Sequence, residues 1–333
     1  MSVLEVLQAG PGVSVQDGGR PGYMALGLSR GGAADPMALA EGAALLRQAP
    51  GVALEMAGFG GRFRVEAARR IALTGAPMRA TVDGVPLAWN ASHMLPSGAV
   101  LEIGGALSGV YGYLTLGGGL DLPEKLGARS AHLSAGLGRV LQTGDRLLLS
   151  GDAGRAIGLT LDPMARFSGG DLRVLPSLQT AFFPKDMRDR FTQERFTRDS
   201  RGNRMGIRLV PEGEGYGLTA GQSILSEVIT AGDIQIPGDG APYVLLNECQ
   251  TTGGYPRIGT VIPADLPKVA QAAPGAALRF RFVTRAEALE AEAGYRRLLA
   301  GLVVRPLLRN PAEMPDLLSY EFISGVTAGE EMP

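Results

Sequence analysis

The sequence has few of the side chains on which metal binding and the commonest catalytic machineries depend. Its 333 residues include one cysteine and two histidines. The lone Cys249 excludes an intramolecular disulfide and fits a reducing compartment. His93 and His132 stand far apart, and with one cysteine they cannot supply the neighbouring ligands of a zinc site, so we expect no metal. Histidines in such small number are more often structural than catalytic, and we assign neither as a general base.

Lysines and long apolar runs are scarce as well. Lys125, Lys185 and Lys268 are the three lysines, and none follows a glycine, which excludes a G-x-x-x-x-G-K-[ST] phosphate loop. No run reaches the roughly 18 apolar residues of a membrane span, and the N-terminus lacks the basic and apolar regions of a signal peptide. The net charge of −1 gives no electrostatic basis for binding nucleic acid or an anionic membrane. We therefore expect a soluble, cytoplasmic protein without nucleic-acid or membrane partners.

Glycine, by contrast, is abundant. The chain has 49 glycines without a Gly-X-Y period, about twice the usual share of roughly 7%. Many tight turns between short runs of apolar residues predict a mainly β fold. The predicted strands cover residues 3–7, 63–65, 71–74, 100–103, 110–116, 146–149, 172–175, 234–236, 243–246 and 277–283.

Helices are predicted at four places. Asp35, followed by Pro36, predicts a capped helix over residues 35–46, and a shorter helix is expected over 185–191. Asp265, with Pro267 just inside, predicts a capped helical turn over 265–272. Thr284 begins a T-x-x-E capping box, which predicts a helix over 286–302.

The last helix carries an apolar stripe that predicts packing on the body of the protein, with the docking of a partner as the alternative; its members are Leu289, Ala293, Leu298 and Leu302. Three prolines from residue 305 to 315 predict a loose tail. A turn-rich stretch at 161–171 suggests a first domain over 1–165, a second over 166–284, and a helix with an extended tail over 285–333.

The stretch Gln250–Asp265, QTTGGYPRIGTVIPAD, has the composition of a binding loop. It offers neutral donors and acceptors on a backbone that bends sharply, which suits a small polar molecule. Its candidate residues are Gln250, Thr252, Gly253, Gly254, Tyr255 and Asp265. The alternative is an elaborate turn around a buried tyrosine.

Other polar groups stand on glycine-flanked loops. Asp17 and Arg20 lie in SVQDGGRPGY, and Arg129 lies in LGARSAH. Arg204, in NRMGIRL, is suited to binding a carboxylate or phosphate. One G-x-S-x-G match surrounds Ser29, but no clear strand leads into it, so we do not assign Ser29 as a nucleophile.

Taken together, these segments resemble the family of allophanate hydrolase subunit 2, also called KipA or the C subunit of 5-oxoprolinase. The resemblance covers nearly the whole chain and is carried by GPGVSVQDGGRPGY, GGAAD, ALEMAGFGG, YLTLGGGLDLPEKLGARSAH, NRMGIRL and QTTGGYPRIGTVIPADLPKVAQAAPG. The chain departs from the family pattern at Ala43, at Ala128, and at Glu248, where an aspartate is common. Because of these departures, the resemblance does not identify the substrate.

The resemblance implies two tandem cyclophilin-like β-barrel domains and two partner proteins, a KipI-like B subunit and a LamB/YcsF-like A subunit. It implies a component of an ATP-dependent 5-oxoprolinase, which opens a small cyclic amide and is not active alone. No stably bound cofactor is expected. In that setting Gln250, Thr252 and Tyr255 would position the amide, Arg20, Arg129 or Arg204 would hold a carboxylate or phosphate, and Asp17 or Asp265 would handle a proton.

Two alternatives come from the same resemblance. One is the carboxyltransferase component of a biotin-dependent urea carboxylase, in which biotin arrives on another protein because this chain has no Met-Lys carrier motif. The other is a non-catalytic, KipA-like regulator that binds a kinase-inhibitor protein.

Overall fold

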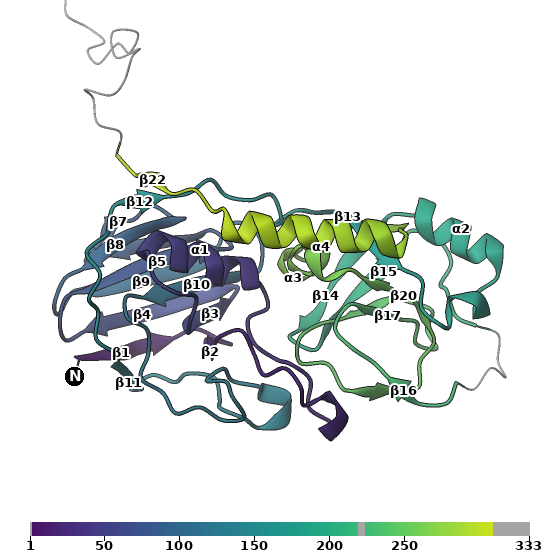
Figure 1. Ribbon diagram of the computed structural model, residues 1–333, viewed down its shortest axis with the longest axis horizontal. Coiled ribbons are helices and arrows are strands. Elements are labelled where there is room, and N and C mark those ends of the chain that lie inside the picture. Colours follow the sequence, from purple (N-terminus) through teal and green to yellow (C-terminus); the bar gives the residue numbers. More distant parts are fainter. Residues whose placement is uncertain (1, 219–223, 309–333) are drawn as a thin grey trace, which may run out of the picture.

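The computed structural model describes residues 2–218 and 224–308. Figure 1 shows two β lobes side by side, with one long helix lying across both. The first lobe contains the strands up to residue 160, and the second contains the strands from 169 to 282. The mainly β prediction is confirmed, while the domain boundaries drawn from the sequence stay a prediction.

The first lobe consists of two packed sheets. One sheet has the strand order β11-β1-β4-β9-β6-β7, and the other has the order β2-β3-β10-β5-β8-β12-β22. The strands are β1 (Ser2–Ala9), β2 (Ser14–Gln16), β3 (Ala53–Ala57), β4 (Phe59–Val65), β5 (Arg69–Gly75), β6 (Met78–Val82), β7 (Val85–Pro86), β8 (Ala91–Leu95), β9 (Val100–Ala106), β10 (Tyr111–Leu116), β11 (Arg146–Leu149), β12 (Leu159–Thr160) and β22 (Arg305–Pro306).

An aliphatic core fills the space between these sheets. Leu4, Phe63, Leu73 and Leu101 are fully buried there. Strands β5 and β10 are buried on both faces because helix α1 (Pro36–Leu46) covers the outer one. The close packing of α1 depends on a small residue, since a Cβ on Gly42 would overlap the Thr115 hydroxyl.

The second lobe is a closed barrel. Its strand order is β13-β20-β17-β18-β15-β14-β21, and the parallel pair β13–β21 completes the circle. The strands are β13 (Gly169–Leu175), β14 (Phe196–Asn203), β15 (Gly206–Pro211), β17 (Asp233–Gln235), β18 (Tyr243–Leu245), β20 (Arg257–Val261) and β21 (Ala277–Phe282). A two-stranded ribbon, β16 (Glu227–Val228) with β19 (Thr252–Gly253), lies outside the barrel ladder.

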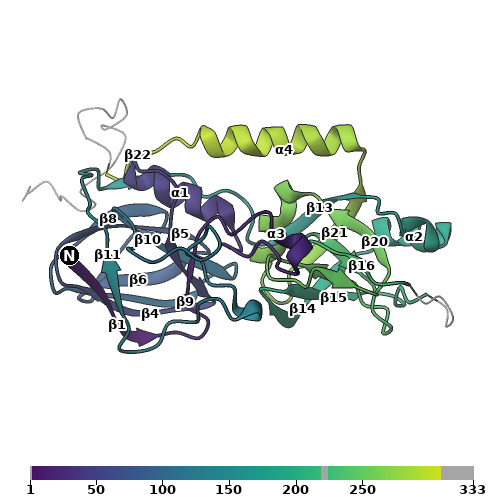
Figure 2. The ribbon, with the colours of Figure 1, turned by 60° about the horizontal axis from the view of Figure 1, so that its bottom comes forward.

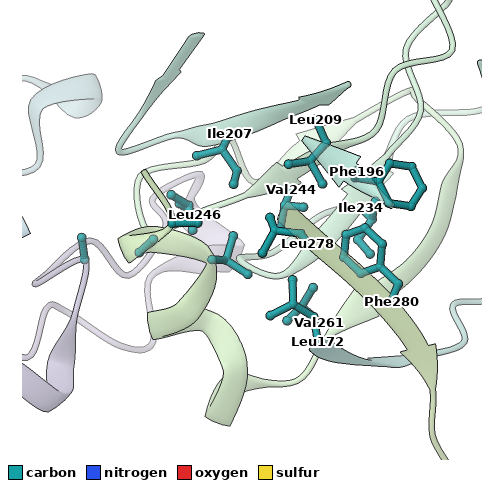
Figure 3. Close-up of a cluster of buried hydrophobic side chains, with 14 of the residues drawn as sticks. Leu172, Phe196, Ile207, Leu209, Ile234, Val244, Leu246, Val261, Leu278 and Phe280 are labelled. Carbon is teal, nitrogen blue, oxygen red and sulfur yellow. The ribbon is translucent and has the colours of Figure 1, made fainter. Parts of the chain in front are cut away.

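Aromatic rings dominate one end of the barrel core. Phe191 stacks on Phe280 with 4.7 Å between ring centroids, and Phe196 and Tyr216 pack against the same group. Figure 3 shows Phe196, Phe280 and the surrounding aliphatic side chains converging from several strands. Ring contacts of this kind are typical of a close-packed protein interior.

The structure contains all four predicted helices, but it corrects the predicted cap of one and the predicted packing of another. The remaining helices are α2 (Lys185–Gln193), α3 (Leu266–Gln271), α4 (Arg285–Ala300) and the short 3₁₀ helices η1 (Met24–Leu26), η2 (Leu133–Ala135), η3 (Thr180–Phe182) and η4 (Pro263–Asp265). Asp35 caps α1, and the Thr284–Glu287 capping box of α4 is present. Asp265 was expected to cap the third helix, but its carboxylate binds Arg173 instead, because that guanidinium offers two charge-assisted bonds.

The second correction concerns which side of α4 packs on the lobes. The helix runs across both lobes in Figure 2 and contacts α1, η4 and β13. The predicted apolar stripe faces outward, since Leu289 is 59% exposed and Leu298 42% exposed. Ala288 and Tyr295 lie on the packed side. The stripe prediction was wrong because the packed side of α4 carries Ala288, Tyr295 and Leu299 and not the stripe residues Leu289 and Leu298.

The first residues of the predicted loose tail form a strand instead. Arg305–Pro306 forms β22, which pairs with Leu159–Thr160, and Arg305 makes an ion pair with Asp162. From residue 309 onward, the predicted tail lies outside the described residues. All ten predicted strands are present, but the sequence did not predict the other strands of the described chain, which include β3, β8, β14, β15 and β20. Within residues 2–218 and 224–308, no helix is long and apolar enough to cross a membrane.

Candidate functional site

A cavity of about 510 Å³ lies between the lobes. The first lobe contributes Asp17, Ser29 and the segment 30–36, and the second contributes Thr230, Asn247 and the start of α3. Helix α4 closes one side with Tyr295. The two lobes are joined around this space, because the Gly31 N–H donates to the Asn247 carbonyl at 2.9 Å and the Asn247 side chain donates to the Ala33 carbonyl. The cavity is therefore built from both halves of the chain.

Ser29 and His132 form a buried hydrogen-bonded pair at this cavity. The Ser29 Oγ lies 3.0 Å from His132 Nε2, and Ser29 and His132 are 6% and 2% exposed. On the other side of the ring, His132 Nδ1 lies 3.2 Å from the Ser134 Oγ. Burial lowers the pKa of His132; the charges of Arg20 and Arg204 lower it further, and the charge of Glu248 opposes them. The imidazole is therefore neutral at neutral pH.

Beneath the cavity, Arg204 lies between two buried carboxylates. Its Nη1 contacts Glu55, and its Nε donates to Glu248 at 2.6 Å. Its Nη2 donates to the Gly32 carbonyl. Burial opposes the charge of Arg204, yet the adjacent Glu55 and Glu248 carboxylates raise the pKa of its guanidinium. Arg204, predicted to hold a substrate, here connects the lobes, and a substrate anion would compete with two resident carboxylates.

Glu55 extends this network to the loop that begins α1. Its Oε2 accepts a bond from the Ala34 N–H at 2.8 Å and one from the Tyr113 hydroxyl at 2.6 Å. The Tyr113 oxygen in turn accepts the Asp35 N–H at 2.8 Å. Burial, together with the charge of Glu55, raises the pKa of Tyr113 well above its ordinary value, so the phenol stays protonated. The GGAAD loop is thereby held in one position.

A second buried arginine completes the interface. Arg166 binds Asp35 at 2.6 Å and forks onto both oxygens of Glu41 at 2.7 and 2.9 Å. Gln271, from α3 of the second lobe, donates to Asp35 at 2.8 Å and accepts the Val110 N–H at 3.0 Å. Burial raises the pKa of Glu41, against the charge of Arg166. These bonds fix the position of α3 relative to the first lobe.

The predicted first-lobe residues Asp17, Arg20 and Arg129 lie close together, but only Asp17 lines the interdomain cavity. The Asp17 carboxylate accepts the N–H groups of Gly19 and Arg129 at 2.8 and 2.7 Å, so it joins two loops. Arg20 is 1% exposed and donates to the Ser130 carbonyl at 2.6 Å, while its Nη1 has no partner among the described residues. Arg129 pairs with Glu124 at the surface and lines a basic pocket of about 240 Å³.

The predicted second-lobe stretch forms a separate groove. Gln250 and Tyr255 line a space of about 320 Å³ together with Gln235, whose amide nitrogen is buried without a partner in the described chain. Tyr255 is 53% exposed, so the alternative of a turn around a buried tyrosine is wrong. Burial raises the pKa of Cys249, also in this groove, to about 12, which keeps its thiol protonated and unreactive.

The other predicted residues of this stretch, Thr252, Gly253, Gly254 and Asp265, do not line the groove. Thr252 and Gly253 form β19, and a Cβ on Gly253 would meet the Gln235 amide nitrogen at 2.6 Å. The nearest atom to a Cβ on Gly254 is 3.4 Å away, so that position is less restricted. Asp265 is 1% exposed and holds β13 through Arg173 at 2.7 Å. The structure thus brings Asp17, Arg20 and Arg129 together but separates them from Gln250, Tyr255 and Asp265.

The residues that sequence reasoning missed are those of the buried network. Glu55 stands in a strand of otherwise apolar residues, ALEMA, which is a signal of a paired buried charge. Ser29 had the G-x-S-x-G match, yet the 3₁₀ helix η1 and Gly27 precede it, so the local fold is not a strand-to-helix elbow. No cluster of three or more metal-ligating side chains occurs within the described ranges.

Comparison with known proteins places the chain in a family. Residues 26–282 match the family described as carboxyltransferase domain, subdomain A and B. The chain is 32% identical over 311 residues to the 5-oxoprolinase C subunit of Escherichia coli strain K12, covering 91% of this chain and 98% of that protein. It is also 32% identical over 293 residues to the 5-oxoprolinase C subunit of Haemophilus influenzae, covering 86% and 93%.

A solved structure shares the fold. The urea amidolyase of Kluyveromyces lactis superposes with a TM-score of 0.79 at 24% identity, over 94% of this chain and 21% of that one. This chain therefore spans about a fifth of that enzyme. The chain belongs to the carboxyltransferase domain family, and it is homologous to the C subunit of 5-oxoprolinase. The family resemblance inferred from the sequence is confirmed.

Proposed function

We propose that this protein is the C subunit of an ATP-dependent 5-oxoprolinase and opens a small cyclic amide together with the A and B subunits. The observation that carries this proposal is the alignment with two proteins of that name over nearly their whole lengths. The family match over residues 26–282 includes Ser29, Thr230 and Asn247 of the cavity.

The interdomain cavity is the proposed binding place for the amide. Its volume of about 510 Å³ falls in the range of roughly 300–1,000 Å³ that small-ligand sites occupy. Thr230 and Asn247 supply neutral polar groups, and the Arg30 guanidinium, held by a 3.0 Å bond from its Nε to Gly18, supplies a positive charge for a substrate carboxylate. Asp17, the predicted proton-handling residue, lies on the same wall.

The groove at Gln250 and Tyr255 is the rival place. Its amide-rich lining also suits a small amide, and the predicted roles of Gln250, Thr252 and Tyr255 require the substrate to lie there. Paired variants separate the two. Removing one hydrogen bond to the substrate costs about 1 kcal/mol, which is a change of roughly fivefold to tenfold in KM.

The test uses the chain with the A and B subunits that accompany it. Release of glutamate from 5-oxoproline is measured with and without ATP, for the wild type, Thr230→Val and Gln250→Ala. We expect ATP-dependent release, a raised KM for Thr230→Val, and an unchanged KM for Gln250→Ala. The Escherichia coli C subunit serves as the positive control. Activity with that control but none with this chain contradicts the proposed function, and the reverse pattern of KM values places the amide in the groove.

Biotin-dependent carboxyl transfer is the second candidate. It is favoured by the family match to a carboxyltransferase domain and by the shared fold with urea amidolyase. Carboxybiotin would have to arrive on a separate carrier. The two functions are separated by incubating the chain with free carboxybiotin and urea or 5-oxoproline, because consumption of carboxybiotin that depends on one of these acceptors supports only carboxyl transfer.

A further inference from the structure

We propose that Ser29 is a nucleophile in the interdomain cavity, that His132 accepts its proton, and that the pair hydrolyses a small amide or ester through an ester on Ser29. For a cyclic amide this inference deepens the proposed function and rests on it. Both residues of the pair belong to this chain, so the reactivity of Ser29 can be measured on the purified protein alone.

Three hydrogen bonds connect the Glu248 carbonyl to Ser134, Ser134 to His132, and His132 to Ser29. The carbonyl fixes the direction of all three. The Ser134 Oγ lies 3.1 Å from the Glu248 carbonyl oxygen, which can only accept, so the Ser134 hydroxyl donates to it. The Ser134 oxygen is then free to accept from His132 Nδ1–H at 3.2 Å. His132 Nε2 is therefore the unprotonated nitrogen, and it accepts from the Ser29 hydroxyl at 3.0 Å.

This tautomer is the one that a serine nucleophile needs. A neutral imidazole with its lone pair on the serine and its N–H fixed by another group is the arrangement of general-base activation. Ser134 is fixed in turn, because its own N–H donates to the Glu248 carboxylate at 3.1 Å. Arg204 holds that carboxylate from the other side. The pair is thus oriented by the same network that joins the lobes.

The loop around Ser29 is shaped to admit the imidazole. Gly31 has a φ of +62°, and a Cβ there would meet His132 Cδ2 at 2.8 Å. A side chain at this position would push the ring away from Ser29. A Cβ on Gly31 would also lie 3.7 Å from Arg20 Nη1. This guanidinium nitrogen is buried and has no hydrogen-bond partner among the described residues. A positive charge beside the pair favours the negative charge that develops on an acyl oxygen.

The reaction balances with water as the second substrate. The Ser29 Oγ bonds to the acyl carbon while its proton moves to His132 Nε2, and that proton passes to the departing nitrogen or oxygen as its bond to carbon breaks. Water then attacks the ester carbon, gives a proton to Nε2, and the Ser29 Oγ recovers its proton as the ester bond breaks. A cyclic amide yields the open-chain amino acid, with its nitrogen still attached.

The test labels the purified chain without partners or ATP. Two small serine reagents, diisopropyl fluorophosphate and phenylmethylsulfonyl fluoride, are followed by intact mass and peptide mapping. We expect one adduct, on Ser29, lost in Ser29→Ala, with a rate reduced by about 100-fold or more in His132→Gln. The rate should be constant above about pH 6.5 and fall only below it, because the lowered pKa keeps His132 neutral at higher pH. Ser92→Ala, a buried serine in β8 that does not line the cavity, is the matched control.

The outcomes separate this inference from the proposed function. No adduct with either reagent on folded protein, an adduct on another serine, or an unchanged rate in His132→Gln overturns the inference. Folding of each variant is checked by circular dichroism and melting temperature. Labelling of Ser29 in a chain that fails the glutamate-release assay refutes only the proposed function. Release of glutamate that persists in Ser29→Ala refutes only the inference for the cyclic amide.

Discussion

The interior of each lobe and the surface between the lobes both exclude water, yet they are built from opposite kinds of side chain. The first lobe buries aliphatic residues between two sheets, and the barrel buries Phe191, Phe196 and Phe280. The surface between the lobes buries Arg204 and Arg166, each bonded to two carboxylates. Apolar contacts tolerate substitutions of similar volume, whereas a buried ion requires its partner.

This difference separates the parts of the molecule that maintain its fold from those that position its chemistry. A network of buried charges fixes the lobes in one relative position, and the Ser29–His132 pair takes its orientation from the Glu248 end of that network. The sensitivity to substitution should therefore be greatest between the lobes and smallest on the outer surface.

Arg204→Met should have the largest effect. It leaves Glu55 and Glu248 buried without a cation, and breaking a buried pair in this way costs about 4 kcal/mol. The measurement is urea denaturation followed by far-ultraviolet circular dichroism. In the control, Glu55→Gln and Glu248→Gln are combined with Arg204→Met, and should recover part of the lost stability. A loss under about 1 kcal/mol for Arg204→Met would mean that water reaches these carboxylates.

Leu209→Ala tests the barrel core by comparison. Leu209 is fully buried on β15, and the truncation should lower the free energy of unfolding by about 3 kcal/mol through lost burial and a cavity. Leu209→Met conserves the volume and should cost less than about 1.5 kcal/mol. The same urea experiment measures both variants. Equal losses for Ala and Met would contradict a packing origin.

Asp265→Asn links stability to pH. Arg173 and its backbone N–H hold the pKa of Asp265 below its ordinary value, although burial opposes them. Because the pKa of Asp265 is lower in the folded state, the ionised carboxylate stabilises the fold at any pH above its unfolded-state pKa of roughly 3.9. This stabilisation is lost as the pH falls through the folded-state pKa. We expect Asp265→Asn to cost about 2 kcal/mol at pH 7, with the difference from wild type shrinking below about pH 4. A difference independent of pH would refute this account.

The same variant tests the prediction that Asp265 handles a proton. The carboxylate lies against Arg173 rather than on either cavity. If its role is to hold η4 on β13, the folded Asp265→Asn enzyme keeps its pH profile of glutamate release. A displaced acidic limb of that profile would instead support the catalytic assignment.

Regular, local patterns account for what the sequence predicts well. Apolar alternation and glycine turns marked the ten strands, and the Thr284–Glu287 box marked the start of α4, because these signals lie within one element. The strand β14 was missed since its second half, DSRGN, is polar and largely exposed. The outward face of α4 was missed because it depends on where the two lobes meet.

The candidate site was predicted only in part for the same reason. Asp17 and Arg129, both candidates from the sequence, share a hydrogen bond, but Arg204 and Glu55 are 149 positions apart in the sequence. No local pattern pairs residues at that separation. Ser29 and His132 are likewise 103 positions apart, and neither the absence of a strand before Ser29 nor the scarcity of histidine indicates that the two side chains meet.

Thr284→Ala should have a moderate effect on α4. The Thr284 Oγ1 accepts the Glu287 N–H at 3.2 Å, and the Glu287 carboxylate accepts the Thr284 N–H at 2.7 Å. Removing this cap should cost about 1 kcal/mol. Thr284→Ser keeps the hydroxyl and serves as the control. Urea denaturation measures both, and equal stability of the alanine and serine variants would show that packing on the lobes alone maintains the start of α4.

Lys185→Ala should have the smallest effect, although it removes the same kind of charge pair as Arg204→Met. Lys185 and Asp189 lie 2.6 Å apart one turn along α2, with side chains 80% and 51% exposed. Solvent screens such a pair, so its loss should change the free energy of unfolding by less than about 0.5 kcal/mol, and the change should be abolished in about 1 M salt. Asp189→Ala is the matched partner variant. A cost near that of Arg204→Met would show that burial is not what separates the two pairs.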